Sequence, residues 1–399
     1  MKSRRGEIGL LFMTYLLTFA IFGNLFILKQ PFDKGALIIA GIVCLLVTYA
    51  YIVIRKFFPD GDKYILQFTA ILSVIGIAMI YRISSGEAIK QIVWFVLGMS
   101  MFILIVVILP DIRNYSKYQM IYLVGTLIFM AMAEFIGTTK YGSKNWVYVG
   151  GFGFQPSEIG KIFLVLYLAS ALSKYKTFLD LIQPALVVMA TLGFMVLQKD
   201  LGSALIFFCI SVTMLYISTS KGKYVLVGFI LFAIGAYISY RLFAHVRLRV
   251  DIWRNPWADP TDKGYQLVQS LIAIASGGFL GSGLGMGYPG YIPVADSDFI
   301  FAAICEEFGT FIGFGIILIY FLLFYRCLRV SFYIEDRFTQ LVAAGYSVMI
   351  ASQVLVIIGG VVGAIPLTGI TLPLLSYGGT SMLTIFFALG ILQKISEDA

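Results

Sequence analysis

Ionisable side chains lie inside strongly apolar sequence at several positions of this chain. Glu158 and Lys161 open one apolar stretch and are spaced i,i+3, so both lie on one face of a helix and can form an ion pair. Pro156 suits the first turn of that helix, and Glu158 suits the positive end of its dipole. The pair is therefore either a structural ion pair at a capped helix end or part of a buried polar network that shapes a substrate cavity.

Asp200 stands at a second break in apolar sequence, directly after Lys199. The two charges separate two apolar runs with almost no loop between them. Ionisable groups at membrane depth are rare and commonly functional. Asp200 is thus either a solvated charge in a tight turn or a member of the same network as Glu158 and Lys161.

The segment 244–298 holds most of the other candidates. Asp259 is followed by Pro260, so its backbone is extended rather than helical and its carboxylate could project from the segment. Taken alone, such an aspartate is usually a solvated surface charge. Arg247 and Arg249 have the guanidinium geometry that holds phosphate oxygens, and they suit lipid-headgroup anchors equally well. Further candidates in and after this segment are Trp257, Gln266, Ser270, Asp298, Glu306 and Glu307.

Glycine-rich sequence occurs in two places beyond these residues. The run from Gly277 to Gly287 lacks the strand and helix context of a phosphate-binding loop, so its glycines are expected to form tight turns beside the membrane. Segment 366–381 combines prolines and glycines with apolar residues and Ser376. Non-helical backbone at membrane depth is tolerated only where protein or a wet cavity covers it. We therefore expect a re-entrant element that lines a cavity.

The composition indicates which elements must position these residues. Of the 399 residues, 60% are hydrophobic and 13% are charged, and the mean hydropathy is +0.92. Soluble domains are nearer to about 45–50% apolar and about 25% charged. A bilayer accommodates such a chain, because each helical crossing needs about 20 mostly apolar residues. The net charge of +8 is expected to come from loop residues that set the membrane topology and contact lipid headgroups, and no nucleic-acid partner is expected.

Twelve apolar runs predict an all-α, polytopic integral membrane bundle of about 12 transmembrane helices, because only helices satisfy their own backbone in lipid at this segment length. Lys and Arg are concentrated in the termini and loops of one side, so both termini are expected in the cytosol. Segment 244–298 then forms a large extracellular loop, and 137–156 a second, glycine- and aromatic-rich outer loop. The runs are 9–28, 35–54, 64–81, 91–109, 119–136, 157–173, 179–197, 202–219, 224–243, 299–325, 338–360 and 377–394.

Cysteine and histidine usage predicts neither a disulfide framework nor a metal site. The four cysteines show no CxxC spacing, and His245 is the single histidine. The apolar stretch after the basic N-terminus is too long for a signal peptide, so it is expected to be a retained first helix.

Four ordered motifs resemble the SEDS family (shape, elongation, division and sporulation), whose members include FtsW, RodA and SpoVE. The family has ten core helices, so 64–399 is expected to form that core and 1–63 an N-terminal tail with two additional transmembrane helices. Three positions depart from the family pattern: Lys199 replaces a frequent Pro, Asn145 a usual Arg and Ser297 a usual Thr. The motifs are Phe154 to Glu158, Gln198 to Gly202, Asn255 to Glu307, and Pro366 to Gly369 with Ser376 to Gly379.

The resemblance implies a peptidoglycan glycosyltransferase that polymerises lipid II into glycan strands at the outer face of the bacterial cytoplasmic membrane, for division or elongation. Asp259 matches the family's catalytic aspartate and would act as general base on the acceptor hydroxyl, with inversion at the donor. Arg247, Arg249 and Lys161 are candidates to hold the departing diphosphate, and a divalent cation, Mg²⁺ or Mn²⁺, is an alternative source of that charge. A class B penicillin-binding protein transpeptidase is the implied partner in the bilayer.

Two other functions fit the sequence. A lipid II flippase or another transporter would use the polar residues at membrane depth and the broken helices, although no repeat relates the two halves of the chain. A non-catalytic scaffold of a cell-wall synthesis complex would not need Asp259. The outward position of Asp259 and the short cytosolic loops favour the glycosyltransferase.

Overall fold

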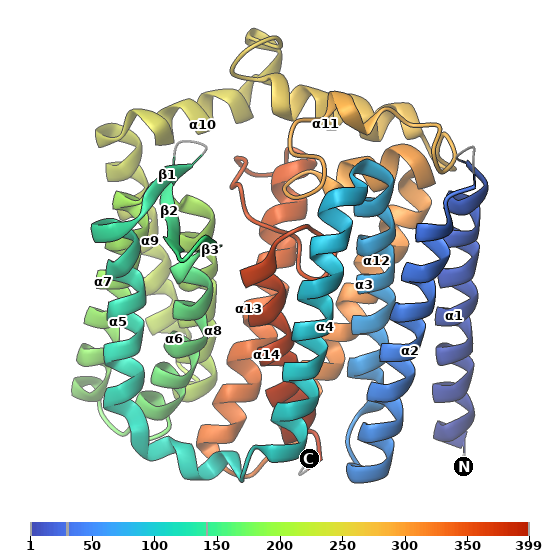
Figure 1. Ribbon diagram of the computed structural model, residues 1–399. Coiled ribbons are helices and arrows are strands. Elements are labelled where there is room, and N and C mark those ends of the chain that lie inside the picture. Colours follow the sequence, from blue (N-terminus) through green and yellow to red (C-terminus); the bar gives the residue numbers. More distant parts are fainter. Residues whose placement is uncertain (1, 29–31, 141–142, 398–399) are drawn as a thin grey trace.

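The computed structural model is an upright bundle of helices (Figure 1). The structure describes residues 2–28, 32–140 and 143–397, and residues 1, 29–31, 141–142 and 398–399 of the predicted segments lie outside this description. The bundle helices are α1 (Lys2–Leu28), α2 (Lys34–Phe57), α3 (Lys63–Ile83), α4 (Ser85–Ile108), α5 (Gln119–Ile136), α6 (Pro156–Leu172), α7 (Ile182–Leu197), α8 (Leu201–Thr219), α9 (Gly222–Leu242), α12 (Ile300–Tyr333), α13 (Arg337–Val361) and α14 (Gly379–Ile395).

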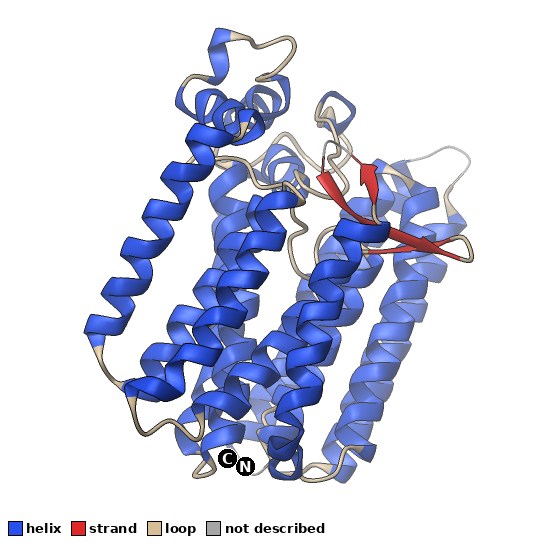
Figure 2. Cartoon of the chain, turned by 90° about the vertical axis from the view of Figure 1, so that its left-hand side faces the viewer, coloured by secondary structure: helices blue, strands red, loops and turns tan. Residues whose placement is uncertain are grey.

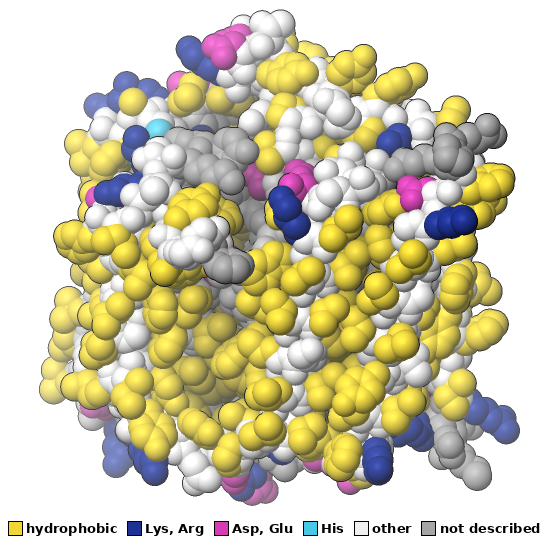
Figure 3. All heavy atoms as spheres, viewed as in Figure 1, with side chains coloured by type: hydrophobic (Ala, Val, Ile, Leu, Met, Phe, Trp, Pro, Cys, Tyr) yellow, Lys and Arg dark blue, Asp and Glu magenta, His cyan; other side chains and the backbone are white. Residues whose placement is uncertain are grey.

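Ten helices of the described chain are long and apolar enough to cross a membrane. Helices α6 and α14 stand in the same bundle but have 17 residues each, or about 25 Å, and are shorter than the others. The predicted polytopic bundle is confirmed, whereas the count of twelve crossings stays a prediction. On the face shown in Figure 3, apolar side chains cover the middle of the molecule and charged side chains gather toward its two ends, as expected of a protein that crosses a bilayer.

Both termini lie at one end of the bundle, and the segment after α9 covers the other end (Figure 1). This segment was predicted only as a long loop, but it contains two further helices that lie across the ends of the bundle helices. The loop between them rises above the rest of the molecule. Its elements are α10 (Ala244–Arg254), the 3-10 helix η3 (Pro256–Ala258), α11 (Tyr265–Gly277) and the 3-10 helix η4 (Pro289–Tyr291).

A small antiparallel sheet lies at the same end as α10 and α11 (Figure 2). The all-α prediction missed this sheet, which is built by β1 (Thr138–Lys140), β2 (Ser143–Val149) and β3 (Phe152–Phe154) in the order β1-β2-β3. Gly150 and Gly151, with φ of 57° and 87°, make the turn between β2 and β3. These left-handed conformations favour glycine because a side chain would clash there.

The centre of the bundle is formed by α3 and α13, which are buried along most of their length. Helices α1 and α2 pack against α3, and Arg55 of α2 pairs with Glu7 of α1 at 2.9 Å. Helix α9 has no buried residue and packs against α8 and α10. The 3-10 helices η1 (Ile112–Tyr118) and η2 (Phe178–Leu181) connect bundle helices at the end where the termini lie. The division of the chain at residue 63 stays a prediction.

Candidate active site

Five polar residues form a buried network in the bundle, called here the central cluster: Glu158, Lys161, Gln353, Thr371 and Ser381. Lys161 Nζ donates to Glu158 Oε1 and to Gln353 Oε1, each at 2.8 Å. Gln353 Nε2 donates to the carbonyl oxygen of Thr371 at 2.9 Å, and the hydroxyls of Thr371 and Ser381 are 2.8 Å apart. Glu158, Lys161 and Gln353 are 5%, 1% and 0% exposed. The predicted ion pair is thus both a helix-end contact and part of a network that joins α6 to α13 and α14.

Asp200 caps the first turn of α8 and is buried, so the alternative of a solvated turn is wrong. Its Oδ1 accepts from Ser203 N at 3.0 Å, and its Oδ2 accepts from Ser203 Oγ at 2.9 Å. Oδ2 also accepts from Asn145 Nδ2 at 3.2 Å and from Gln155 Nε2 at 3.1 Å. Among the described residues no hydrogen bond joins Asp200 to Glu158 or Lys161, so it belongs to a separate group. Asn145, one of the departures from the family pattern, is one of its donors.

Asp200, Arg249 and Asp298 form a second group, called here the rim cluster, around residues 367–369. Arg249 Nη1 donates to the carbonyl oxygens of residues 367 and 368 at 3.3 and 3.2 Å. A Cβ placed on Gly369 would lie 3.6 Å from Asp298 Oδ2. Burial raises the pKa of Asp298 to about 6, although the Ser297 side chain and the charge of Arg249 oppose that rise. Burial lowers the pKa of Arg249, and the charges of Asp200 and Asp298 act in the other direction.

Asp259 lies on the loop that rises between α10 and α11 (Figure 1). Its φ and ψ of −146° and 73° are non-helical, as the following Pro260 predicts. The carbonyl oxygen of Asp259 accepts from Gly264 N at 2.9 Å, and a Cβ on Gly264 would lie 2.2 Å from the carbonyl oxygen of Pro256. The loop therefore closes tightly on glycine. In the described chain no hydrogen bond or ion pair engages the Asp259 carboxylate, which leaves it available to a substrate.

Three other predicted residues of the outer segment are exposed. Trp257 is 56% exposed and lies two residues before Asp259, and Gln266 is exposed at the start of α11. Arg247 is also exposed, and its Nη2 donates to the carbonyl oxygen of Arg241 at 3.0 Å. Trp257 and Gln266 therefore present exposed side chains on either side of Asp259 along the chain, whereas Arg247 points to the end of α9.

Two anchors hold α10 and α11 over the end of α13. Ser270 is fully buried, and its Oγ donates to the carbonyl oxygen of Val361 at 2.9 Å. Trp253 Nε1 donates to the carbonyl oxygen of Gly363 at 2.9 Å. Together with Arg249 these contacts fix the outer segment on the segment that follows α13. The loop that carries Asp259 is therefore anchored on both sides.

Glu306 and Glu307 lie in the first turns of α12 and bind the glycine run rather than facing an open cavity. Glu307 Oε1 pairs with Arg82 Nε at 3.1 Å, and its Oε2 accepts from Gly285 N at 3.1 Å. Glu306 Oε1 accepts from Tyr288 N at 3.0 Å. The two carboxylates therefore tie the run to α12 and to the end of α3.

Helix α12 is interrupted where the glycine run crosses it. Gly309 has φ of 82°, and the backbone amides of Ser282 and Gly283 donate to the freed carbonyls of residues 306 and 307 at 3.0 and 2.9 Å. A Cβ on Gly309 would lie 2.3 Å from the carbonyl oxygen of Phe279. The glycines predicted to make tight turns do so, and they also permit a close backbone approach.

Ser376 connects the last non-helical segment to the end of the outer segment. Its Oγ donates to the carbonyl oxygen of Ser297 at 2.5 Å and accepts from Leu372 N at 2.8 Å. Gln91 Nε2 donates to the carbonyl oxygen of Ser376 at 3.0 Å. Segment 366–378 is thus covered by protein, as expected of a re-entrant element, and it contributes to both the central and the rim cluster.

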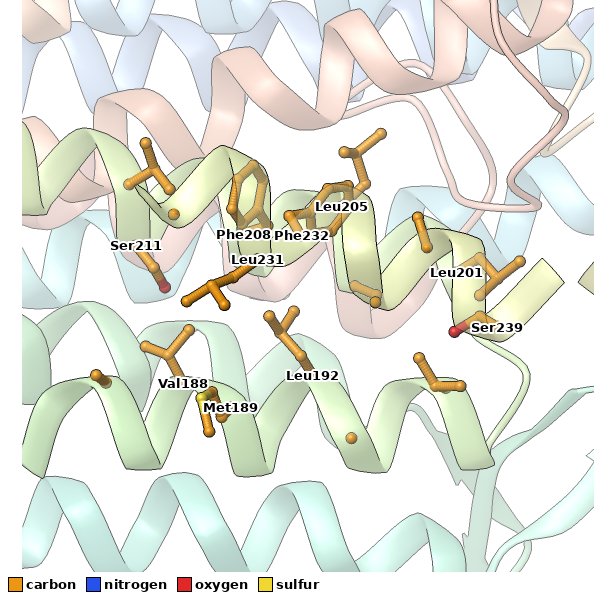
Figure 4. Close-up of a pocket in the computed structure, with 18 of the residues that line it drawn as sticks. Val188, Met189, Leu192, Leu201, Leu205, Phe208, Ser211, Leu231, Phe232 and Ser239 are labelled. Carbon is orange, nitrogen blue, oxygen red and sulfur yellow. The ribbon is translucent and has the colours of Figure 1, made fainter. Parts of the chain in front are cut away.

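An apolar groove of about 1250 Å³ runs along α7, α8 and α9 toward α10. Figure 4 shows side chains from α7, α8 and α9 directed into this space, among them Leu192, Phe208 and Phe232. Arg249 is the only charged residue among the described residues that line it. The groove therefore joins an apolar channel at membrane depth to the guanidinium of the rim cluster.

Sequence reasoning missed two residues that engage buried charges in the structure, Gln353 and Arg82. Gln353 lies in the second half of the apolar run 338–360, and an amide inside apolar sequence was the signal that could have revealed it. Arg82 was counted only as a loop charge, although it pairs with a buried glutamate. Their partners lie far away in the sequence, so spacing alone could not reveal the pairs.

Comparison with known proteins identifies the chain. The model of the FtsW, RodA and SpoVE family, described as cell cycle proteins, matches residues 63–399. The chain belongs to the FtsW/RodA/SpoVE family. The peptidoglycan glycosyltransferase RodA of Mycobacterium tuberculosis is 36% identical over 429 aligned positions, which cover 99% of this chain and 91% of the relative.

Two further relatives agree with the family assignment. The stage V sporulation protein E of Bacillus subtilis is 33% identical, covering 84% of this chain and 97% of the relative. The structure of a peptidoglycan synthase complex that coordinates polymerization and crosslinking contains a similar chain, with a TM-score of 0.66 and 25% identity. That match covers 93% of this chain and 99% of the other. The chain is therefore a multi-pass membrane protein of the FtsW/RodA/SpoVE fold.

Proposed function

We propose that this protein polymerises lipid II into peptidoglycan strands, with Asp259 as the general base. Its class as a peptidoglycan glycosyltransferase follows from its family and from relatives that carry that activity in their names. The observation that carries the substrate assignment is the apolar groove that ends at Arg249. A lipid-linked sugar needs an apolar channel for its tail, a cation for its diphosphate and an open outer surface for its sugars.

The groove along α7, α8 and α9 would hold the polyprenyl tail of one substrate molecule. The walls of the groove are almost entirely apolar, so the tail can pack against them without leaving polar groups unpaired. Gly193 and Gly235 line the groove, and a Cβ on either would meet no other atom within 4 Å. These small residues keep the groove wide.

Arg249 would hold the diphosphate where the groove meets the outer segment. A guanidinium matches phosphate oxygens with two parallel hydrogen bonds, and charge on the leaving diphosphate grows in the transition state. Of the three cations predicted for this task, Lys161 is already bonded to Glu158 and Gln353 inside the bundle. Arg247 does not line the groove, so Arg249 is the remaining candidate.

Asp259 would accept the proton of the acceptor hydroxyl as that oxygen attacks the anomeric carbon of the donor. The bond from that carbon to the diphosphate breaks at the same step, which inverts the configuration and requires one base. An unengaged carboxylate on a loop anchored by Trp253 and Ser270 suits this task, since both reactants are held at the membrane surface. Trp257 and Gln266 would contact the sugars.

We further propose that the end with both termini faces the cytosol and that a class B penicillin-binding protein transpeptidase is the partner. Basic residues at the termini end, such as Arg55, Lys56, Arg113 and Lys117, support the orientation because they are enriched on the cytosolic side. The similarity to a chain of a peptidoglycan synthase complex supports the partner. Among the described residues no group of three or more His, Cys, Asp or Glu could hold a metal ion. A requirement for Mg²⁺ or Mn²⁺ stays a prediction, and no step is assigned to it.

Polymerisation of labelled lipid II by the purified protein, with and without a class B partner, tests the proposal. Gly193→Phe would fill the groove and should reduce glycan chain formation at least tenfold, as expected when a tail loses its site. Gly41→Phe is the matched control, since Gly41 lies on α2, away from the groove, and its Cβ would also meet no atom within 4 Å. It should behave as the wild type.

The alternatives give other results. A flippase would form no glycan chains under any condition and would move lipid II across liposome membranes. A scaffold would do neither and would only recruit the transpeptidase. Equal polymerisation by the Gly193→Phe and Gly41→Phe variants would refute the groove as the tail site while leaving the glycosyltransferase activity standing.

A further inference from the structure

The outer end of the apolar groove carries a hydroxyl group to which the proposed function gives no role. Thr368 lies in the non-helical segment between α13 and α14, and it lines the groove together with Arg249. The residue is 8% exposed, and among the described residues its Oγ1 has no hydrogen-bond partner. Most buried polar side-chain atoms have a partner. An unpaired hydroxyl in the wall of a groove therefore points to a ligand that accepts its hydrogen bond.

Two contacts hold Thr368 at this end of the groove. Arg249 Nη1 donates to the carbonyl oxygen of Thr368 at 3.2 Å, so the guanidinium lies beside the residue that carries the free hydroxyl. A Cβ on Gly202, in the first turn of α8, would lie 2.8 Å from the Cβ of Thr368, and this close approach requires glycine. Figure 4 shows Leu201 and Ser211 at opposite ends of the part of the groove that it draws, and Thr368 lies at the Leu201 end.

Other buried hydroxyls near the groove are satisfied within their own helices. Ser211 lines the groove, and its Oγ donates to the carbonyl oxygen of Phe207 at 2.7 Å. Thr191 of α7 is fully buried, and its Oγ1 donates to the carbonyl oxygen of Val188 at 2.8 Å. A preceding helical turn supplies the acceptor in both cases. Thr368 lies outside a helix and has no such turn before it, so the folded chain leaves its hydroxyl free.

We infer that the Thr368 hydroxyl donates a hydrogen bond to the diphosphate that Arg249 holds, so that the groove selects lipid diphosphates over other lipids with the same tail. This inference rests on the proposed function. A guanidinium has five N–H donors, so Arg249 can keep its bonds to residues 367 and 368 and still offer others to phosphate oxygens. Hydrogen bonds to ionised oxygens are stronger than those between neutral groups, which makes one added hydroxyl significant.

The acidic residues near Arg249 leave this position to the ligand. Asp200 and Asp298 act on the charge of Arg249, but neither of them lines the groove. The Asp200 carboxylate is already engaged by Ser203, Asn145 and Gln155. Because nearby carboxylates reduce the attraction that Arg249 alone exerts on an anion, a second, uncharged donor adds to the binding of the diphosphate.

The binding of two lipids with the same tail to the purified full-length protein, a polyprenyl diphosphate and the corresponding polyprenol, tests the inference in native mass spectrometry. Thr368→Val removes the hydroxyl and keeps the branched shape. It should lower the affinity for the diphosphate about tenfold, the usual effect of a hydrogen bond to a charged group, and leave that for the polyprenol unchanged. Thr368→Ser keeps the hydroxyl and should bind the diphosphate within about threefold of the wild type.

Thr191→Val is the matched control, because it makes the same chemical change at a paired hydroxyl that does not line the groove. It should bind both lipids as the wild type does. The Tm separates a binding role of Thr368 from a structural one. Thr368→Val removes an unpaired buried group, so its Tm should equal or exceed that of the wild type.

Three results would overturn the inference: unchanged diphosphate affinity in Thr368→Val, an equal loss of polyprenol binding, or a Thr368→Ser variant as weak as Thr368→Val. A lower Tm of Thr368→Val would also overturn it, by assigning the hydroxyl to folding. If Arg249→Leu still loses diphosphate affinity in these cases, only the role of Thr368 fails. A wild type that binds both lipids equally would refute the diphosphate site itself, and with it the substrate assignment of the proposed function.

Discussion

Replacing Lys161 by methionine should destabilise the protein strongly, because it would leave Glu158 without its cation inside the bundle. The side chains of Lys161 and Glu158 are 1% and 7% exposed, and their Nζ–Oε1 distance is 2.8 Å. Loss of one partner from a buried pair costs about 3–5 kcal/mol. Gln353 Oε1 would also lose its donor, which adds to the loss. At about 2 °C per kcal/mol for a chain of this size, the Tm should fall by roughly 6–10 °C.

An exposed pair of the same spacing provides the control. Lys90 and Glu87 are also spaced i,i+3, with an N–O distance of 2.9 Å, but their side chains are 62% and 30% exposed. Exposed pairs contribute about 0.2–1 kcal/mol, so Lys90→Met should shift the Tm by no more than about 2 °C. The Tm of each purified variant in one detergent, followed by intrinsic fluorescence, measures the difference.

A double variant separates the ion pair from packing. Glu158→Gln combined with Lys161→Met removes both charges, so its Tm should lie closer to that of the wild type than the single Lys161→Met variant does. Equal Tm losses in Lys161→Met and Lys90→Met would refute the reasoning. The reasoning would also be refuted if the Tm loss of the double variant exceeded the sum of the losses in the two single variants, because the two charges would then not stabilise each other.

Three further predictions follow from the rim cluster and the kink in α12. Arg249→Leu should lower kcat/KM for lipid II roughly tenfold or more, whereas Arg247→Leu should change it less than about threefold, and equal losses would contradict the diphosphate assignment. Because the pKa of Asp298 is raised, the folded protein holds the proton of this carboxyl more tightly than the unfolded chain does. The stability that this proton contributes is present below about pH 4 and is lost as the pH rises through about 6. The Tm of the wild type should therefore fall relative to that of Asp298→Asn between about pH 4 and pH 7, and parallel curves would refute this. Gly309→Ala should cost about 1–3 kcal/mol of stability because of its φ of 82° and the Phe279 oxygen, whereas Gly315→Ala, with open space around its Cβ, should be neutral; similar Tm values would count against the kink.

The bundle could be predicted from the sequence because membrane-spanning helices are recognisable as long runs of apolar residues. Each predicted apolar run corresponds to a bundle helix, and most bounds agree within a few residues. The exceptions are α1, which starts at Lys2 instead of residue 9, α4, which starts at Ser85 instead of residue 91, and α12, which continues beyond the predicted 325 to Tyr333. Arg326 and Arg329 lie in that extension, and their long apolar stems allow charged heads to reach the membrane surface from a helix. The prediction ended this helix too early because it treated these charged residues as the end of the apolar run.

The elements outside the bundle were harder to predict. Residues 265–277 form a helix of 13 residues, which is too short to be recognised as a membrane crossing. The three strands are too short to show a clear alternation of apolar and polar residues. The candidate site showed a similar division. Asp200 and the Glu158–Lys161 pair were found as ionisable groups in apolar sequence. Their separation into two clusters depends on Asn145, which donates to Asp200, and on Gln353, which accepts from Lys161, and these contacts form only in the folded chain.

The most direct test of the central claim compares two aspartates of one loop in the lipid II polymerisation assay. Asp259 and Asp262 both lie on the loop between α10 and α11, and Asp262 is exposed. Asp259→Asn should reduce glycan chain formation about 10²–10⁴-fold, the usual contribution of a general base, while Asp262→Asn should polymerise as the wild type does. Equal glycan ladders from the two variants would contradict the assignment of Asp259 as the base.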